Sequence, residues 1–348
     1  MYLTEKEIFS QQEALEKSFD SVMSERSKLA GYLAASRRRY VFFGCGSSYM
    51  LAKSAAKMFA LKPGVDAYAI AGGDYLLDPD LHQPLVENTV IVFLSRSGST
   101  SEILRAAEEL RKHGNGPLVS ITMREKSALE DMADYSLTLP WAFDESVCQT
   151  RTVTNFFVVL LLMSAIYDGN QAQIDDVSKA ISEVSGLLNK WRPSLADIAR
   201  EKTFSDVVVL ADGVLCGIAE EASLAFTEIC LISGKYFNLL DYRHGPKVLN
   251  STSTLTIVAI QPVDNPNKTK LQDDLLNDIK ACGGTTVVIR PQKNTDFTGD
   301  FTIDCDFTFF PTYGIALICA AQILALEKAL SSGINPDKPS GLTAWISL

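Results

Sequence analysis

Short apolar runs alternate along the chain with longer stretches in which apolar residues recur every three or four positions. The apolar runs at 40–43, 89–94 and 118–122 predict buried strands. Stretches with helical spacing follow two of these runs, at 49–61 and 101–114, and the second stretch ends at a glycine. This order of strand, helix and strand predicts a parallel sheet that is covered by helices.

The second half of the chain repeats this order, which indicates an internal duplication. VVLADGVLCGIAEEASLAF at 208–226 follows the same plan as VFFGCGSSYMLAKSAAKMF at 41–59: an apolar strand, a glycine turn and an alanine-rich helix. A polar segment with helical spacing joins the halves and is interrupted at 191–193, so we expect two domains, 1–190 and 191–348. Further strands are predicted at 67–70, 136–139, 206–210, 255–260 and 286–289, and further helices at 4–35, 152–168, 215–233, 271–284 and 312–331.

Composition and charge narrow the class of protein. Apolar residues make up 47% of the 348 residues, which is enough for two sizeable cores. The net charge of −10 disfavours nucleic acid and anionic lipid as partners. The longest apolar run, at 156–167, is too short to cross a bilayer and predicts a buried helix. The N-terminal residues lack the apolar core of a signal peptide, so we expect a cytoplasmic protein with no membrane contact.

The cysteines predict neither a metal site nor a disulfide framework. There are seven, scattered along the chain, with no C-x-x-C motif and no group of cysteine and histidine. Free thiols in a reducing compartment fit this pattern, and no metal or organic cofactor is expected.

Two loops rich in hydroxyl groups lie where open α/β sheets bind ligands, between a strand and the helix after it. They are GCGSS at 44–48 and SRSGST at 95–100. Each following helix offers unpaired N–H groups to an anion, and Gly98 lets the backbone approach it. We therefore expect the two loops to bind one phosphate group. Their hydroxyl donors are Ser47, Ser48, Ser95, Ser97, Ser99 and Thr100.

Other interpretations of these loops are weaker. Serine and threonine are expected at helix N-termini as ordinary caps, which explains one loop more easily than two. A dinucleotide fingerprint needs a third glycine, which GCGSSY lacks, and there is no Walker A sequence. The hydrolase elbow needs glycine at the position of Ser95.

Glu228 and His244 are the candidate catalytic residues. Glu228 flanks the apolar stripe of the helix predicted at 215–233, so partial desolvation is expected to raise its pKa toward that of a general base. The alternative is a glutamate at the edge of a buried face. His244 lies between Arg243 and a Gly-Pro turn in LLDYRHGPKVL. Taken alone, it could equally be a structural or simply exposed histidine.

Together these motifs resemble the double sugar isomerase (SIS) domain family, which includes the isomerase half of glucosamine-6-phosphate synthase. The resemblance covers essentially the whole chain, and the spacing of 244 − 228 = 16 residues between glutamate and HGP turn matches. It implies two tandem three-layer α/β/α domains of flavodoxin-like type. It also implies a homodimer in which His244 reaches the site of the partner chain.

The resemblance implies a role for each candidate residue. Glu228 would move the proton between C1 and C2 of a sugar phosphate, and His244 would assist ring opening or protonate the leaving group. Gly46 belongs to the first phosphate loop, and a third substrate loop falls near Val147 and Gln149. The implied phosphate ligands are Ser47, Ser48, Ser95, Ser97 and Thr100.

The departures from the synthase change the expected reaction. The chain goes straight into the first sugar-binding half, so we expect no glutaminase part and no ammonia source. The position of the synthase's Schiff-base lysine falls near Ala344, and no lysine follows Lys338. The second half lacks a serine-rich loop, so we expect one phosphate site per chain. These features favour an enzyme that removes the amine from a 6-phosphorylated amino sugar or fructosamine, which is a deaminase or a deglycase. Of the two, the missing lysine favours the deglycase. A pure aldose–ketose isomerase and a non-catalytic phosphosugar sensor remain alternatives.

Overall fold

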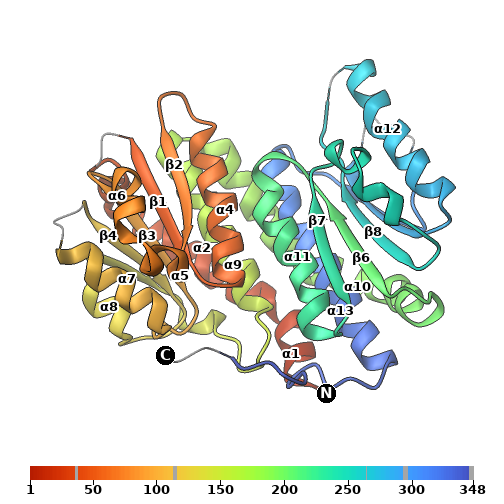
Figure 1. The fold of residues 1–348 in the computed structure, drawn as a ribbon, viewed down its shortest axis with the longest axis horizontal. Helices are drawn as coiled ribbons and strands as arrows, with labels where there is room; N and C mark the ends of the chain where they lie inside the picture. Colours follow the sequence, from red (N-terminus) through yellow and green to blue (C-terminus); the bar gives the residue numbers. More distant parts are fainter. Residues whose placement is uncertain (36–37, 113–115, 264, 293–296, 345–348) are drawn as a thin grey trace. The chain divides into compact units, whose positions relative to one another are not determined.

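The computed structural model describes residues 1–35, 38–112, 116–263, 265–292 and 297–344, which contain two five-stranded parallel sheets (Figure 1). The chain divides into two compact units. Unit 1 comprises Met1–Phe9, Ser146–Cys148 and Glu183–Leu342. Unit 2 comprises Ser10–Glu145, Gln149–Ser182 and the residues from Thr343 on.

The units differ from the expected domains, because each unit collects three separate segments of the chain and the long central division falls after Ser182. The expected domains, 1–190 and 191–348, are continuous. The boundary between the two domains stays a prediction.

Unit 2 is a three-layer sandwich around a sheet with the strand order β2-β1-β3-β4-β5. Its strands are β1 (Arg39–Gly44), β2 (Asp66–Ala71), β3 (Val90–Ser95), β4 (Leu118–Thr122) and β5 (Tyr135–Thr138). Its helices are α2 (Gln11–Ser24), α3 (Arg26–Leu33), α4 (Ser47–Ala60), α5 (Gly72–Leu77), α6 (Pro79–Val86), α7 (Ser101–Lys112), α8 (Ala128–Met132) and α9 (Arg151–Asp168).

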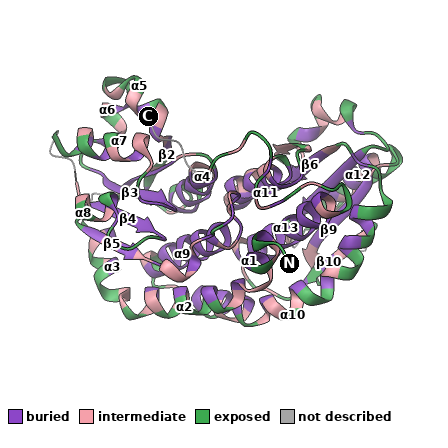
Figure 2. Ribbon diagram, turned by 90° about the horizontal axis from the view of Figure 1, so that it is seen from below, coloured by how far each residue is buried: buried purple, intermediate pink, exposed green. Residues whose placement is uncertain are grey.

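The central strands of unit 2 are buried along almost their whole length because helices cover both faces of the sheet, as the burial colours of Figure 2 show. Successive side chains of a strand point to opposite faces. Phe43 and Phe93 therefore pack under the helices α5 to α8. Tyr40 packs on the other face, against Phe59 of α4 and Tyr167 of α9.

Unit 1 has the strand order β10-β9-β8-β6-β7. Its strands are β6 (Asp206–Leu210), β7 (Ser233–Phe237), β8 (Thr254–Ala259), β9 (Thr285–Pro291) and β10 (Phe301–Cys305). Its helices are α1 (Leu3–Phe9), α11 (Cys216–Ile229), α12 (Pro266–Ala281) and α13 (Tyr313–Ser331), and α10 (Gln171–Glu201) runs from unit 2 into unit 1. Helix α12 packs on one face of the sheet, and α11 and α13 pack on the other.

Counted along the chain within each unit, both sheets have the order 2-1-3-4-5, which is the flavodoxin-like arrangement. The fold class predicted from the sequence, two tandem α/β/α sandwiches with parallel sheets, is confirmed. The shared strand order also agrees with an internal duplication.

Three predicted elements need correction. The helix predicted at 4–35 is divided into α1, α2 and α3. The helix predicted at 215–233 ends at Ile229, because Leu231 adopts a left-handed φ of 58° and the Ile232 amide bonds to the Phe226 carbonyl. The break predicted at 191–193 is absent, since α10 continues through Pro193 while the buried Trp191 and Leu195 hold it against the core. The helix predicted at 101–114 is described as far as Lys112.

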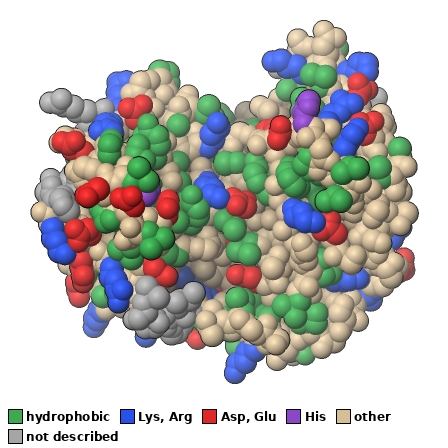
Figure 3. All heavy atoms as spheres, in the orientation of Figure 1, with side chains coloured by type: hydrophobic (Ala, Val, Ile, Leu, Met, Phe, Trp, Pro, Cys, Tyr) green, Lys and Arg blue, Asp and Glu red, His purple; other side chains and the backbone are tan. Residues whose placement is uncertain are grey.

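Two segments, Arg151–Asp168 and Phe310–Ser331, are long and apolar enough to cross a membrane. In each, 83% of the apolar window is buried within the fold, which is the behaviour of core helices. On the face drawn in Figure 3, acidic and basic side chains are interspersed.

Candidate active site

The two hydroxyl-rich loops lie at the topological switch point of the unit 2 sheet. Strand β1 lies between β2 and β3, so the chain leaves β1 toward one edge of the sheet and leaves β3 toward the other. Ligands of open α/β sheets bind in the crevice outside the carboxyl ends of such a pair. Gly44 ends β1 and Ser95 ends β3, and each loop leads directly into a helix of at least twelve residues.

The loop after β3 is held by its own hydroxyl groups. Ser95 Oγ accepts a hydrogen bond from the Gly98 amide at 3.1 Å, and Ser97 Oγ accepts one from the Ser99 amide at 3.1 Å. A hydroxyl that accepts through oxygen keeps its hydrogen for another acceptor, such as a phosphate oxygen. Ser95 and Ser97 are each 3% exposed, so an anion bound to them would be shielded from water. Thr100 is half-buried at the start of α7.

The loop after β1 presents two further hydroxyl groups, from Ser47 and Ser48, which are each 4% exposed. The residue before α4 is Gly46, which has no side chain with which to cap the helix and has a left-handed φ of 54°. Ser47 and Ser48 lie within the first turn, so helix capping does not account for them.

Arg96, in the middle of the SRSGST loop, is a residue that the sequence analysis missed. It is only 5% exposed, and its Nη2 donates a hydrogen bond to the Ala344 carbonyl at 2.6 Å. Its guanidinium lies 5.8 Å from the centre of the Phe143 ring. The loop that was expected to bind an anion through hydroxyl and amide groups alone therefore also contains a buried cation, the Arg96 guanidinium. The C-terminal residues after Ala344 lie outside the described residues.

The predicted third loop is divided between the units, with Val147 in unit 1 and Gln149 in unit 2. The Val147 amide donates to the Asp337 carbonyl at 3.3 Å. Gln149 is half-buried, and its Oε1 atom has no hydrogen-bond partner among the described residues.

A buried carboxylate lies beside the third loop, in unit 2. Asp144 Oδ2 accepts hydrogen bonds from the amides of Thr150 at 2.7 Å and Thr152 at 2.9 Å, which orders the start of α9. Burial raises the pKa of Asp144 even though these amides and the nearby Arg151 favour the charged form.

Glu228 and His244 both belong to unit 1. Glu228 lies in the last turn of α11 and is half-buried, next to the buried Ile229. His244 is exposed and follows a 3₁₀ turn, Asp241–Arg243, and its amide donates to the Asp241 carbonyl at 2.9 Å. The catalytic roles of Glu228 and His244 stay predictions. Among the described residues, no three side chains of His, Cys, Asp or Glu form a group that could bind a metal ion.

The residues on either side of His244 fix part of the backbone around it. Tyr242 is 1% exposed and packs in the unit 1 core with its ring 5.5 Å from that of Phe237. Gly245 has a φ of 130°, which favours glycine, and a second 3₁₀ turn, Pro246–Leu249, follows it.

Comparisons with known proteins agree with this fold. Residues 32–165 match the family model described as SIS domain, which confirms the predicted resemblance. The isomerizing glutamine–fructose-6-phosphate aminotransferase of Sulfolobus acidocaldarius is 24% identical over 352 residues, covering 99% of this chain and 56% of that protein. The enzyme of the same name from Chlamydia trachomatis is 24% identical over 361 residues, covering 100% and 58%. The chain thus spans little more than half the length of these relatives.

Solved structures cover the chain almost completely. A glucosamine-6-phosphate deaminase from Thermotoga maritima has a TM-score of 0.80 and 25% identity, covering 99% of this chain and 100% of its own. A tagatose-6-phosphate ketose/aldose isomerase from Escherichia coli has a TM-score of 0.81 and 22% identity, covering 99% and 97%, and shows the shared fold. The chain therefore has the phosphosugar isomerase fold, and these comparisons support an enzyme.

Proposed function

We propose that the protein is an enzyme that acts on a 6-phosphorylated amino sugar or fructosamine and cleaves its C–N bond, as a deaminase or deglycase. The observation that carries this proposal is the pair of hydroxyl-rich loops at the switch point of a sheet with the SIS fold. The names of the similar proteins support the substrate class, since each refers to a hexose 6-phosphate or its amino sugar.

The loops supply enough hydrogen bonds to hold the phosphate. A hydrogen bond to a charged group contributes about 1.5–3 kcal/mol. Four such bonds would supply about 6–12 kcal/mol, whereas a micromolar dissociation constant needs about 8 kcal/mol. The proposed phosphate ligands are Ser47, Ser48, Ser95, Ser97 and Thr100, with Gly46, Val147 and Gln149 as further substrate contacts.

In the proposed reaction Glu228 is the general base that moves the proton between C1 and C2, which converts the carbon bound to nitrogen into an imine. Water then adds to this carbon, and the amine leaves as the carbonyl group forms. His244 protonates the ring oxygen or the departing amine. The half-buried position of Glu228 suits a carboxylate that exchanges a proton with substrate. Ala344, near the position expected for the synthase's Schiff-base lysine, accepts a hydrogen bond from Arg96 through its carbonyl. This favours a fructosamine, whose C–N bond can break without a Schiff base on the enzyme.

We also propose that the enzyme is a cytoplasmic homodimer in which His244 completes the site of the partner chain. Val248 and Leu249, four and five residues after His244, are 82% and 67% exposed. Exposed apolar side chains beside a catalytic residue fit an interface between copies of the chain.

A pure aldose–ketose isomerase is the second candidate. The structural similarity to tagatose-6-phosphate ketose/aldose isomerase favours it, because an isomerase would use the same phosphate loops and the same base. It differs from a deaminase or deglycase in releasing no amine.

Phosphorus NMR of the protein with a panel of sugar phosphates tests the proposal. The panel contains glucosamine 6-phosphate, galactosamine 6-phosphate, a fructosamine 6-phosphate such as the lysine adduct, and tagatose 6-phosphate. We expect a new phosphoester signal with free amine or ammonia from one of the first three, and no conversion by Glu228→Gln. Conversion of tagatose 6-phosphate alone would favour the isomerase. Shifted signals without any product would contradict an enzyme and leave a phosphosugar sensor.

A further inference from the structure

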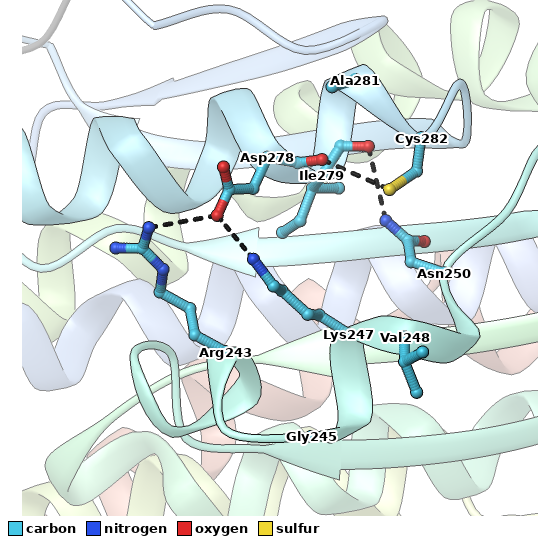
Figure 4. A pocket seen from close by; sticks show the side chains of 9 residues that line it. All are labelled: Arg243, Gly245, Lys247, Val248, Asn250, Asp278, Ile279, Ala281 and Cys282. Carbon is cyan, nitrogen blue, oxygen red and sulfur yellow. Dashed lines mark hydrogen bonds and ion pairs between the residues drawn. The ribbon is translucent and has the colours of Figure 1, made fainter.

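The turn that carries His244, residues 241–250, is tied to helix α12 by one carboxylate. Asp278 Oδ2 accepts from Arg243 Nη2 at 3.1 Å and from Lys247 Nζ at 2.9 Å, as Figure 4 shows. These two cations stand on either side of His244, one residue before it and three residues after it. The same oxygen atom therefore holds both arms of the turn.

The turn needs such an attachment because its backbone hydrogen bonds are local. The amides of His244, Val248 and Asn250 bond to carbonyl groups only three residues earlier. Apart from the two ion pairs of Asp278, Asn250 Nδ2 donates to the Ile279 carbonyl at 3.4 Å, and the Tyr242 ring is buried in the core. Within the described part of the chain, these contacts attach the two flanks of the turn, and the ion pairs of Arg243 and Lys247 attach the segment between them.

The turn does not pack tightly on α12, because a pocket of about 480 Å³ opens between them. Figure 4 shows the carboxylate of Asp278 and the two cations meeting on one side of this pocket. Its lining residues are Arg243, Gly245, Lys247, Val248, Asn250, Asp278, Ile279, Ala281 and Cys282. Ion pairs across an open pocket replace the side-chain packing that would otherwise set the orientation of the turn.

We propose that Asp278 is a positioning residue that sets the orientation of His244 by clamping Arg243 and Lys247. Without its negative charge, two like charges face each other across the turn and repel. The inference rests on the proposed role of His244 as the acid of the reaction. Hydrogen bonding to Lys247 holds the pKa of Asp278 below its usual range, so the clamp is charged at neutral pH.

The clamp can be tested without unfolding the protein. Its three side chains are 34–41% exposed, and ion pairs at such positions contribute little to global stability. The test variant is Asp278→Asn. The matched control is Asp274→Asn, which removes the ion pair of Asp274 with Lys270 at 2.6 Å, one turn earlier on the same exposed side of α12. Asp278→Glu restores the charge.

Hydrogen exchange and steady-state kinetics on the intact protein give the two readouts. In Asp278→Asn we expect faster amide exchange in 241–250 with an unchanged unfolding midpoint. On the substrate identified by phosphorus NMR, we expect kcat to fall about tenfold to a hundredfold at unchanged KM, because misplacing a catalytic group by about 1 Å costs up to that factor. Asp274→Asn should match the wild type, and Asp278→Glu should recover part of kcat.

Exchange in 241–250 that is the same in all variants would overturn the clamp itself. Faster exchange with unchanged kcat would overturn its role in placing His244. If the wild-type protein converts none of the sugar phosphates, the proposed function fails, while the exchange measurement still decides whether Asp278 orders the turn.

Discussion

Gly98 in the loop after β3 provides the sharpest test of the phosphate-loop geometry. Its φ is 59°, and a Cβ atom there would lie far inside van der Waals contact with Oγ and Cβ of Ser127 and 3.1 Å from Thr122 Oγ1. Ser127 is the N-cap of α8, where its Oγ accepts from the Glu130 amide at 3.3 Å. Gly98→Ala therefore combines backbone strain with a steric clash against a capping residue.

The two costs can be separated by comparison with Gly46, in the loop after β1. Gly46 has a similar φ of 54°, but nothing lies within 4 Å of its Cβ position. Gly46→Ala should therefore cost only the backbone strain of its φ of 54° and ψ of −129°, about 1–3 kcal/mol. Gly98→Ala combines a left-handed strain of about 1–2 kcal/mol with an overpacking cost of about 1–3 kcal/mol, for a total of about 2–5 kcal/mol.

A second substitution should rescue the first. Ser127→Gly removes both clashing atoms and, since glycine is a tolerable N-cap, costs only a few tenths of a kcal/mol by itself. The double variant of Gly98→Ala and Ser127→Gly should therefore be more stable than Gly98→Ala alone. The coupling free energy between the two positions should be about 1–3 kcal/mol.

Urea unfolding of the four variants, followed by circular dichroism and fluorescence, measures these free energies. A loss of no more than about 2 kcal/mol in Gly98→Ala, which is the left-handed strain alone, would refute the clash. Additive effects of Gly98→Ala and Ser127→Gly would refute the contact between the SRSGST loop and α8. Either result would mean that the loop adopts a different path after β3.

Three further predictions concern other parts of the chain. Asp337→Ala should lower the free energy of unfolding by about 1–3 kcal/mol in urea, because it removes the partner of the Leu3 and Thr4 amides at 2.9 and 2.8 Å. Burial raises the pKa of Asp134, but hydrogen bonds from Arg111 and the Leu118 amide outweigh it, so the pKa lies below its usual range. As the pH falls, Asp134 is therefore protonated at a higher pH in the unfolded state than in the folded state. The wild type should be more stable than Asp134→Asn above about pH 4 and should lose this advantage below it, as urea titrations at several pH values would show. A thiol reagent should modify the exposed Cys282 first, whereas burial raises the pKa of Cys230 and Cys319 to about 12 and protects them, as mass spectrometry of the native protein would reveal.

The sequence predicted the elements whose signal is local. Strands β4 (Leu118–Thr122) and β6 (Asp206–Leu210) have the predicted bounds, because central strands of a parallel sheet are buried on both faces and are therefore rich in apolar, β-branched residues. Strand β7 was missed, because SGKYF lies at the edge of the sheet and is only half-buried. The left-handed Leu231 that ends α11 is neither glycine nor asparagine, so nothing in the sequence marks it.

The candidate site likewise contains features that could be predicted from the sequence and features that could not. The serine-rich loops could be predicted, because their place between strand and helix is a local pattern. The burial of Arg96 could not, because it depends on a contact with Ala344, 248 residues further along the chain. The ion pairs of Asp278 with the His244 turn join residues 31 and 35 positions apart, and only the packing of α12 on the sheet brings them together.

The discontinuity of unit 1 has a consequence for the order of folding during synthesis. Most of unit 2 is complete once residue 182 has left the ribosome, whereas the amides at the start of α1 bond to Asp337, 333 residues after Thr4. At a synthesis rate of about 5–20 residues per second, Asp337 is made roughly 17–67 s after Thr4. Loop closure over that length costs little more free energy than over half of it, since the cost grows only with the logarithm of loop length. Residues 1–9 are thus made long before the segment on which they dock, and until then they lack the rest of the unit to which they belong.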